Sequence, residues 1–211
     1  MKTKFFLIYS LCSLLFVACN DNEPNSLKDL SGNGTLNGHD YVDLGLPSGT
    51  LWDTCNVGAS SSEKYGDYFA WGETESKLYY DQSTYKFYNE GDELTKYCND
   101  SDEEENGFVD YKTELDASDD VATAKWGKNW RMPSILELEE LMDECSWTEE
   151  TINGVRGYQI SSSNGNHIFL PAANSRYEDS VGNSGNCGFY WSKTLLKESP
   201  KAAHILSFVF G

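Results

Sequence analysis

The chain has few basic residues, a single extended apolar run and no recognisable catalytic motif. Its 16 Lys and Arg residues stand against 34 Asp and Glu residues, which gives a formal net charge of −18. Such a charge repels phosphate backbones, so it argues against nucleic-acid binding. It suits a soluble protein displayed at a cell surface, or one that binds cations.

The cysteines do not form the spacings that bind zinc or perform redox chemistry. Four of them lie beyond the N-terminal region, and none forms a CxxC pair: Cys55, Cys98, Cys145 and Cys187. Four cysteines allow three disulfide pairings, which the sequence does not separate. The sequence is therefore compatible with two disulfide bridges, with one bridge or with none.

The three histidines, His39, His167 and His204, are isolated from one another and from any recognisable Ser or Cys motif. A catalytic His needs a nucleophile or an orienting group within reach. We therefore expect no enzymatic activity, no cofactor and no bound metal.

The N-terminus has the pattern of a secretory signal peptide. Residues 1–4 carry two lysines, and residues 5–17 form an apolar run broken only by Ser10, Cys12 and Ser13. The run has 13 residues, whereas a helix that spans a bilayer needs about 20. We therefore expect residues 1–18 to be removed.

The Cys19 that follows Ala18 resembles the acylated first residue of bacterial lipoproteins. Phe16 departs from the Leu that this lipoprotein pattern usually has three places before the Cys. The resemblance implies a lipid anchor on Cys19. The alternative is an ordinary signal peptide with a coincidental Cys.

A short acidic stretch, NDNE at residues 20–23, follows Cys19 and resembles the surface-export signal of lipoproteins from the Bacteroides group. This implies a domain on the outer face of the outer membrane; a solvated linker is the alternative. Residues 19–38 are rich in Asn, Gly and Ser, which predicts a flexible tether. Residues 39–211 then form one domain.

Short strands and tight turns are predicted through most of this domain. Residues 41–46 alternate, with Val42, Leu44 and Leu46 on one face, and a turn at 47–49 leads into a returning strand at 50–52. Asn-Gly pairs are strong hairpin signals. The other predicted strands are 65–71, which is irregular, then 155–160 after Asn153-Gly154, 167–170 after Asn164-Gly165, 189–192 and 204–210.

Two helices are predicted, at residues 119–126 and 134–145. Ser134 and Glu137 have the spacing of a capping box, and Asp119 and Asp120 are favourable at a helix N-terminus. In the second helix we expect Glu137, Glu139, Glu140, Asp143 and Glu144 to point away from the apolar face, which is formed by Ile135, Leu138, Leu141, Met142 and Cys145.

Two segments are predicted as loops. Residues 89–107 form a solvated loop with five acids in the six residues 100–105, for which a calcium site is the alternative. Residues 172–187 form a loop rich in Gly and Asn. The fold class is therefore α+β, with two helices between antiparallel hairpins and long loops.

Several segments together resemble the major paralogous domain of Fibrobacter succinogenes, which is common in Bacteroides-type lipoproteins. The resemblance covers residues 39–195 and implies a C-type lectin-like fold, related to the domain of formylglycine-generating enzymes. The segments are YVDLGLPSGTLW at 41–52, CNVGA at 55–59, YGDYFAWGET at 65–74, WRMPS at 130–134, IFLPAA at 168–173 and GFYWS at 188–192.

Two departures from the family limit what the resemblance implies. Family members usually continue to a final segment that contains Arg and Val, whereas this sequence ends at Gly211. A missing closing strand would leave an unpaired edge, so a truncated chain and an outlier both stay open. The later loops also lack the calcium-and-sugar tripeptides of true C-type lectins, so calcium-dependent sugar binding is not implied.

The sequence thus predicts a lipoprotein, anchored to the membrane through Cys19, whose domain binds a glycan or a host or cell-surface protein. Aromatic faces stack on sugar rings, and Arg and Asn hydrogen-bond to hydroxyl groups. The candidate ligand-binding residues are Asn174, Arg176, Tyr177, Tyr190 and Trp191. For Tyr190 and Trp191 a core position is the alternative, and for Arg176 the alternative is that it braces the loop. A structural or assembly subunit of a surface complex is the second hypothesis, and an enzyme of the formylglycine-generating type is the third.

Overall fold

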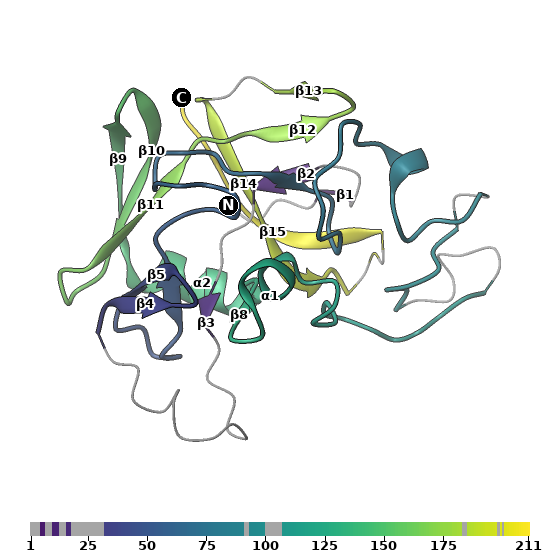
Figure 1. Ribbon diagram of the computed structural model, residues 1–211, viewed down its shortest axis with the longest axis horizontal. Helices are drawn as coiled ribbons and strands as arrows, with labels where there is room; N and C mark the ends of the chain where they lie inside the picture. Colours follow the sequence, from purple (N-terminus) through teal and green to yellow (C-terminus); the bar gives the residue numbers. More distant parts are fainter. Residues whose placement is uncertain are drawn as a thin grey trace.

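The computed structural model describes residues 32–90, 93–99, 107–182, 185–197, 199 and 201–211 (Figure 1). Nearer the N-terminus it gives only the backbone of three short strands, β1 (Phe5–Phe6), β2 (Ser10–Cys12) and β3 (Phe16–Val17). The predicted anchor Cys19, the export stretch 20–23 and the acidic run 100–105 lie outside the described residues. In the described part, no helix is long and apolar enough to cross a membrane.

The first hairpin of the domain is confirmed. β5 (His39–Asp43) pairs antiparallel with β6 (Leu51–Asp53), and Val42 lies opposite Trp52. The predicted apolar face, Val42, Leu44 and Leu46, is buried together with Trp52. β4 (Gly34–Leu36) pairs with β5, so folded structure begins inside the segment predicted as a tether.

The segment between this hairpin and the first helix has little regular structure. It contains the two-residue strand β7 (Tyr68–Phe69) and the 3-10 helix η1 (Gln82–Thr84). The prediction of a solvated loop from residue 89 is wrong at Leu94, Tyr97 and Cys98, which are all buried. They are buried because their side chains pack in the core with Trp71 and Phe87.

Both predicted helices are confirmed. α1 (Val121–Trp126) is capped by Asp120, whose carboxylate accepts from the N–H groups of Ala122 and Thr123. α2 (Ile135–Glu144) begins with the predicted capping box between Ser134 and Glu137. Glu137, which was predicted to lie off the apolar face of this helix, is nevertheless buried, because it pairs with Arg131 at the end of β8 (Trp130–Arg131).

A three-stranded antiparallel sheet follows α2, formed by β9 (Ser146–Ile152), β10 (Val155–Ser161) and β11 (His167–Pro171). The predicted turn between β9 and β10 is confirmed, because Asn153 and Gly154 both have positive φ, at 51° and 83°. The pairing of β10 with β11 ends at Pro171, as predicted.

The last part of the chain contains β12 (Ser175–Tyr177), β13 (Ser180–Val181), β14 (Cys187–Leu195) and β15 (Ala202–Val209). The two long strands confirm those predicted near 189–192 and 204–210. The prediction of an unstructured loop at 172–187 is wrong, because β12 and β13 form a small hairpin within it.

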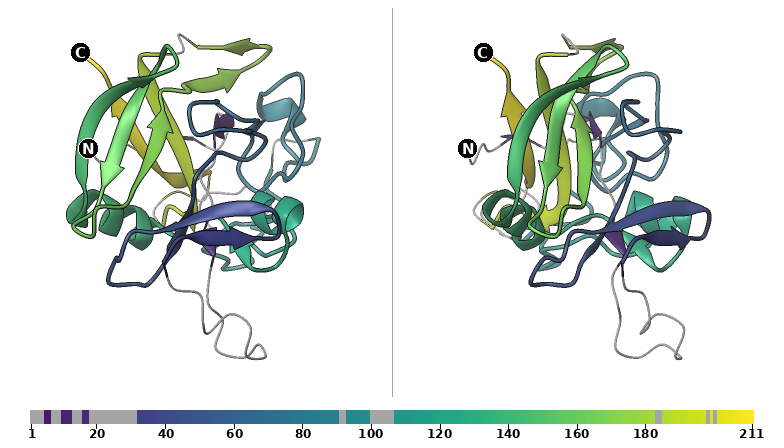
Figure 2. Two further views of the ribbon diagram at one scale, coloured as in Figure 1. Left: turned by 60° about the vertical axis from the view of Figure 1, so that its left-hand side comes forward. Right: turned by 90° about the vertical axis from the view of Figure 1, so that its left-hand side faces the viewer.

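The strands form three sheets (Figures 1 and 2). In the first sheet the strand order is β1-β15-β14-β2-β12-β13, and β7 also pairs with β2. The second sheet has the order β11-β10-β9, and the third has the order β4-β5-β6-β3-β8. β14 and β15 separate two cores, since alternate residues of a strand face opposite sides. Trp191 and Ile205 enter the core that contains Trp71, while Tyr190 and Leu206 enter the core that contains Trp52. The fold is therefore α+β with mostly antiparallel sheets.

Candidate functional site

Two of the five predicted ligand-binding residues belong to the core. Tyr190 and Trp191 are fully buried, and both donate to backbone carbonyls: Tyr190 to Pro171, and Trp191 to Phe69 at 3.1 Å. A ligand at the surface cannot reach either ring. The prediction that Tyr190 and Trp191 bind ligand is therefore wrong, because both faces of β14 are covered.

The other three predicted residues lie at the β12–β13 hairpin. Asn174 is buried at the start of β12, with φ at 60°, and its side-chain oxygen accepts from the N–H of Ser175 at 2.7 Å. This bond gives Asn174 a role in shaping the hairpin. Arg176 and Tyr177 follow on β12, where the chain reaches the surface.

A second segment, far away in the sequence, is attached to this hairpin. Tyr80 and Glu178 exchange two backbone hydrogen bonds, at 2.9 and 2.8 Å. The Nη2 of Arg176 donates to the carbonyl of Leu78 at 3.1 Å, and its guanidinium lies over the Tyr80 ring at 5.4 Å. Arg176 therefore fastens the segment at 78–81 to the hairpin.

Together the two segments expose an unusual amount of apolar surface. The exposed fractions are 84% for Leu78, 42% for Tyr79, 46% for Tyr177 and 44% for Val181. These four residues and Arg176 are named here the Tyr79–Tyr177 surface. Exposed apolar side chains on two segments that are bonded to each other are typical of an interaction site.

The charge around this surface is mostly negative. The fully exposed carboxyl-bearing residues Glu178 and Asp179 and the half-buried Asp81 lie beside it. Partial desolvation, together with the carboxylates of Glu178 and Asp81, raises the pKa of the Tyr79 hydroxyl. The shift is away from neutral pH, where a tyrosine is protonated in any case, so the hydroxyl is able to donate a hydrogen bond to a ligand.

Arg176 supplies a cation to the Tyr79–Tyr177 surface, and its Nη2 also lies 3.4 Å from the carbonyl of Asp179. Its Nη2 is used by the carbonyl of Leu78, while its Nε is buried and has no hydrogen-bond partner among the described residues. A buried donor without a partner is costly unless water or a ligand satisfies it. The arrangement thus combines two tyrosine rings, one guanidinium and nearby carboxylates.

Sequence reasoning placed Arg176 and Tyr177 at this site and missed Leu78 and Tyr79. These two residues lie in a stretch with neither strand nor helix periodicity, almost a hundred residues before the hairpin. The available signal was a Leu-Tyr-Tyr run at 78–80 within a polar stretch. It gives no indication of where the run lies in the fold.

The cysteine and histidine side chains do not gather at one site among the described residues. The structure gives no disulfide to Cys55, Cys98, Cys145 or Cys187, and burial raises the pKa of the Cys55, Cys145 and Cys187 thiols. His39 stacks on Trp126 at 3.8 Å, and burial lowers its pKa. Across the described residues, no group of three or more His, Cys, Asp or Glu side chains is placed to hold a metal.

Comparisons with protein-family models, with curated proteins and with solved structures find no match for this chain.

Proposed function

We propose that this chain is a lipid-anchored protein of the outer membrane, exposed at the cell surface, that displays a non-catalytic binding domain of C-type lectin-like fold. Its ligand, a glycan or a protein, contacts the Tyr79–Tyr177 surface. The observation that carries the proposal is that the segment with the exposed Leu78 and Tyr79 is bonded, through Tyr80 and Arg176, to the hairpin that carries the exposed Tyr177.

The chemistry of this surface supports a carbohydrate or protein ligand. Tyrosine is enriched at interfaces because it offers an apolar ring and a polar hydroxyl together. Arg176 donates, and the carboxylates of Glu178 and Asp179 accept, so that both roles in hydrogen bonding to hydroxyl or amide groups are present. The apolar residues Leu78 and Val181 add to the area of the Tyr79–Tyr177 surface that a single sugar or a peptide would contact.

The experiment that tests the proposal is a screen of the purified protein against a glycan array and against glycoproteins of the host or cell surface. Binding that is lost when Tyr79 and Tyr177 are both replaced by Ala supports the proposal. Absence of binding to every glycan and glycoprotein contradicts it. Tyr111→Ala is the matched control, because Tyr111 is 79% exposed in a different part of the chain.

The anchor is tested separately, because a domain that binds ligand does not by itself establish a lipid. Cys19→Ala should abolish incorporation of labelled palmitate and release the protein from the membrane fraction. Protease digestion of intact cells should remove the domain if it is exposed at the surface. A protein that resists protease until the cells are lysed would contradict the surface location.

The second candidate function is a structural subunit of a surface complex. The third candidate, an enzyme of the formylglycine-generating type, requires two cysteines that together hold copper. The four described cysteines are not joined by disulfides, and copper-dependent oxidation by the purified protein would support this candidate.

A further inference from the structure

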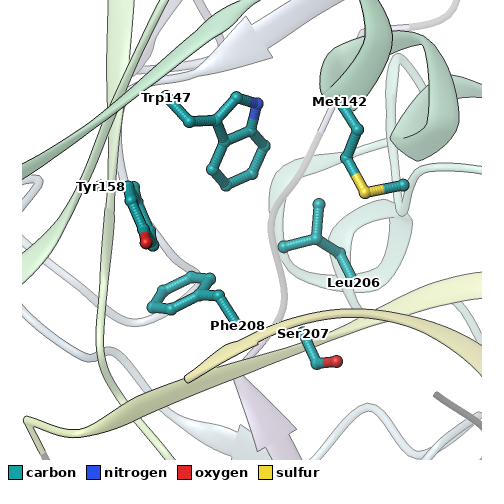
Figure 3. Close-up of a pocket in the computed structure, with 6 residues that line it drawn as sticks. All are labelled: Met142, Trp147, Tyr158, Leu206, Ser207 and Phe208. Carbon is teal, nitrogen blue, oxygen red and sulfur yellow. The ribbon is translucent and has the colours of Figure 1, made fainter. Parts of the chain in front are cut away.

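A hollow of about 330 Å³ lies at the surface between α2, β9, β10 and β15 (Figure 3). Five uncharged side chains surround it: Met142 of α2, Trp147 of β9, Tyr158 of β10, and Leu206 and Phe208 of β15. The first three are half-buried, and the two from β15 are buried. Ligand pockets have volumes of about 300–1,000 Å³, so a hollow of this size fits a small molecule.

Three of the five side chains are aromatic, and their rings stand at steep angles to one another. The ring centroids of Trp147 and Tyr158 lie 5.6 Å apart, with 67° between the ring planes. Those of Tyr158 and Phe208 lie 5.0 Å apart, with 89° between the planes. Figure 3 shows the Tyr158 ring edge-on beside the enclosed space, with one face toward it. The three rings thus border one small volume from different sides, as the walls of an aromatic cage do.

These aromatic walls are held in place by contacts behind them. The Nε1 of Trp147 donates to the carbonyl of Leu141 in α2 at 3.2 Å. Phe208 stacks on the fully buried ring of Tyr190, with 6.2 Å between the centroids. The cage is therefore formed before a ligand arrives, and binding requires little rearrangement.

The lining of the hollow favours recognition through ring faces over hydrogen bonds. Within the described ranges, no charged residue lines it, and the N–H of Trp147 is already used by Leu141. Ser207 also lines the hollow, but Figure 3 shows its hydroxyl turned away from the other five side chains. A ligand therefore meets an apolar lining and the negative faces of aromatic rings.

Carboxyl-bearing residues lie beside the hollow. Glu149 is directly opposite Tyr158 in the pairing of β9 with β10, and Asp143 and Glu144 follow Met142 at the end of α2. All three acidic residues are exposed. The chain as a whole has 34 acidic residues against 16 basic ones. This face therefore attracts a cation and repels an anion.

A cation of the protein already occupies a neighbouring part of this face. The guanidinium of Arg156 lies over the Phe210 ring at 4.0 Å, and its Nε donates to Glu149 at 2.6 Å. Phe210 in turn lies 4.9 Å from the Tyr158 ring. Arg156 shows that an aromatic ring and a carboxylate hold a cation together here. Its own charge is balanced by Glu149, so that Asp143 and Glu144 are left to attract a ligand.

We propose that the hollow binds a small organic cation whose charge is covered by methyl groups, as in choline. Its trimethylammonium group lies between Trp147, Tyr158 and Phe208, whose rings attract the positive charge. Met142 and Leu206 contact the methyl groups. A phosphocholine group would bring a phosphate against the carboxylates, so the ligand is a free cation with no attached anion.

Calorimetric titration of the purified protein with three ligands tests this proposal. The ligands are choline, the uncharged alcohol of the same shape, 3,3-dimethyl-1-butanol, and phosphocholine. We expect choline to bind about tenfold more tightly than either of the others. Equal binding of the alcohol would show selection for apolar shape alone, and equal binding of phosphocholine would show that the carboxylates play no part. Either result, or no binding of choline, would overturn the proposal.

Tryptophan fluorescence locates the bound choline in the unaltered protein. Trp147 is half-buried, whereas the other five of the six tryptophans in the chain are buried. Acrylamide should therefore quench Trp147 first, and saturating choline should reduce this quenching. Quenching that choline leaves unchanged would place the ligand elsewhere and contradict the assignment to this hollow.

A matched pair of variants tests the contribution of one ring. Tyr158→Leu keeps an apolar side chain and removes an aromatic face, so it should weaken choline binding about tenfold and change binding of the alcohol little. Tyr111→Leu is the control, because Tyr111 is 79% exposed in a different part of the chain. Thermal unfolding checks that both variants are folded. Unchanged choline binding in folded Tyr158→Leu, or an equal loss for both ligands, would contradict the cage.

The hollow is separate from the Tyr79–Tyr177 surface and does not depend on the function proposed for that surface. The double variant Tyr79→Ala, Tyr177→Ala should therefore bind choline as the unaltered protein does. Failure of choline to bind is thereby distinguished from failure of a glycan or protein to bind the Tyr79–Tyr177 surface. A loss of choline binding in the double variant would contradict the placement of the site.

Discussion

At the scale of single residues, Asp53 is the most unusual ionisable group of the core. It is 2% exposed; its Oδ1 accepts from the N–H of Cys55 at 2.6 Å, and its Oδ2 has no partner among the described residues. Burial raises the pKa of Asp53 to about 7, although the backbone N–H donors of Cys55 and Thr54 oppose the shift. The ionised carboxylate is therefore unfavourable in the folded protein.

This raised pKa predicts that the protein loses stability as the pH rises from about 4 to 7. In that range the unfolded chain releases the Asp53 proton and the folded chain retains it, so that deprotonation favours unfolding. Asp53→Asn keeps the acceptor for Cys55 and removes the charge. We expect the variant to be more stable than the unaltered protein by about 2 kcal/mol at pH 8, and equally stable near pH 4.

Urea unfolding at pH 4, 6 and 8 measures this difference directly. Asp143→Asn serves as the control, because Asp143 is exposed on α2. A stability difference between Asp53→Asn and the unaltered protein that stays constant from pH 4 to pH 8 would show that Asp53 ionises normally.

At the scale of elements, the start of α2 depends on a buried ion pair. Arg131 donates to both carboxylate oxygens of Glu137, with Nη1 to Oε2 at 2.7 Å, and Thr50 donates to Oε1 at 2.8 Å. Burial alone would raise the pKa of Glu137, but the bonds from Arg131 prevail and lower it to about 2. Glu137 thus joins α2 to β8 and to the first hairpin.

Replacement of Glu137 by Gln should destabilise the protein by about 2 kcal/mol at pH 7, because the half-buried charge of Arg131 loses its partner. The pKa of Glu137 is depressed in the folded state, so this stability is present above about pH 4.5 and is lost as the pH falls toward 2. Thermal unfolding at pH 7 and pH 3 measures both effects. Glu144→Gln, on the exposed side of α2, should change little; an equal loss in both variants would refute the account.

The elements that local chemistry determines could be predicted from the sequence. The Ser134–Glu137 capping box and the Asn153-Gly154 turn act within a few residues, and both are found where the sequence places them. The burial of Glu137 could not be predicted, because it depends on Arg131 in another element. The β12–β13 hairpin was missed because its strands are only three and two residues long, too short to show an alternation of apolar and polar residues.

The same limit explains what was predicted of the candidate site. Arg176 and Tyr177 were recognisable as a polar and aromatic pair in a late loop. Leu78 and Tyr79 join them only through the backbone bonds between Tyr80 and Glu178, which no local pattern signals. Conversely, the aromatic character of Trp191 suggested a ligand-binding residue, although its neighbours in the fold make it core.

At the scale of the whole molecule, the two cores on either side of β14 and β15 leave the cysteines with different accessibility. Cys98 is completely buried, while Cys55, Cys145 and Cys187 are half-buried with raised pKa values. Alkylation at pH 7.5, followed by peptide mass spectrometry, should modify the last three slowly and Cys98 only after denaturant is added. Rapid labelling of Cys98 in the native protein, or a disulfide-linked peptide pair, would contradict this arrangement.

The central claim is that this molecule displays a binding surface built from Leu78, Tyr79, Arg176, Tyr177 and Val181. Its most direct test is the affinity of the purified protein for its best array ligand, measured by calorimetry with and without the Tyr79→Ala, Tyr177→Ala substitutions. The account predicts a loss of at least about tenfold in the double variant and no change in Tyr111→Ala, with equal thermal stability in all three proteins. An unchanged affinity in the double variant would contradict it.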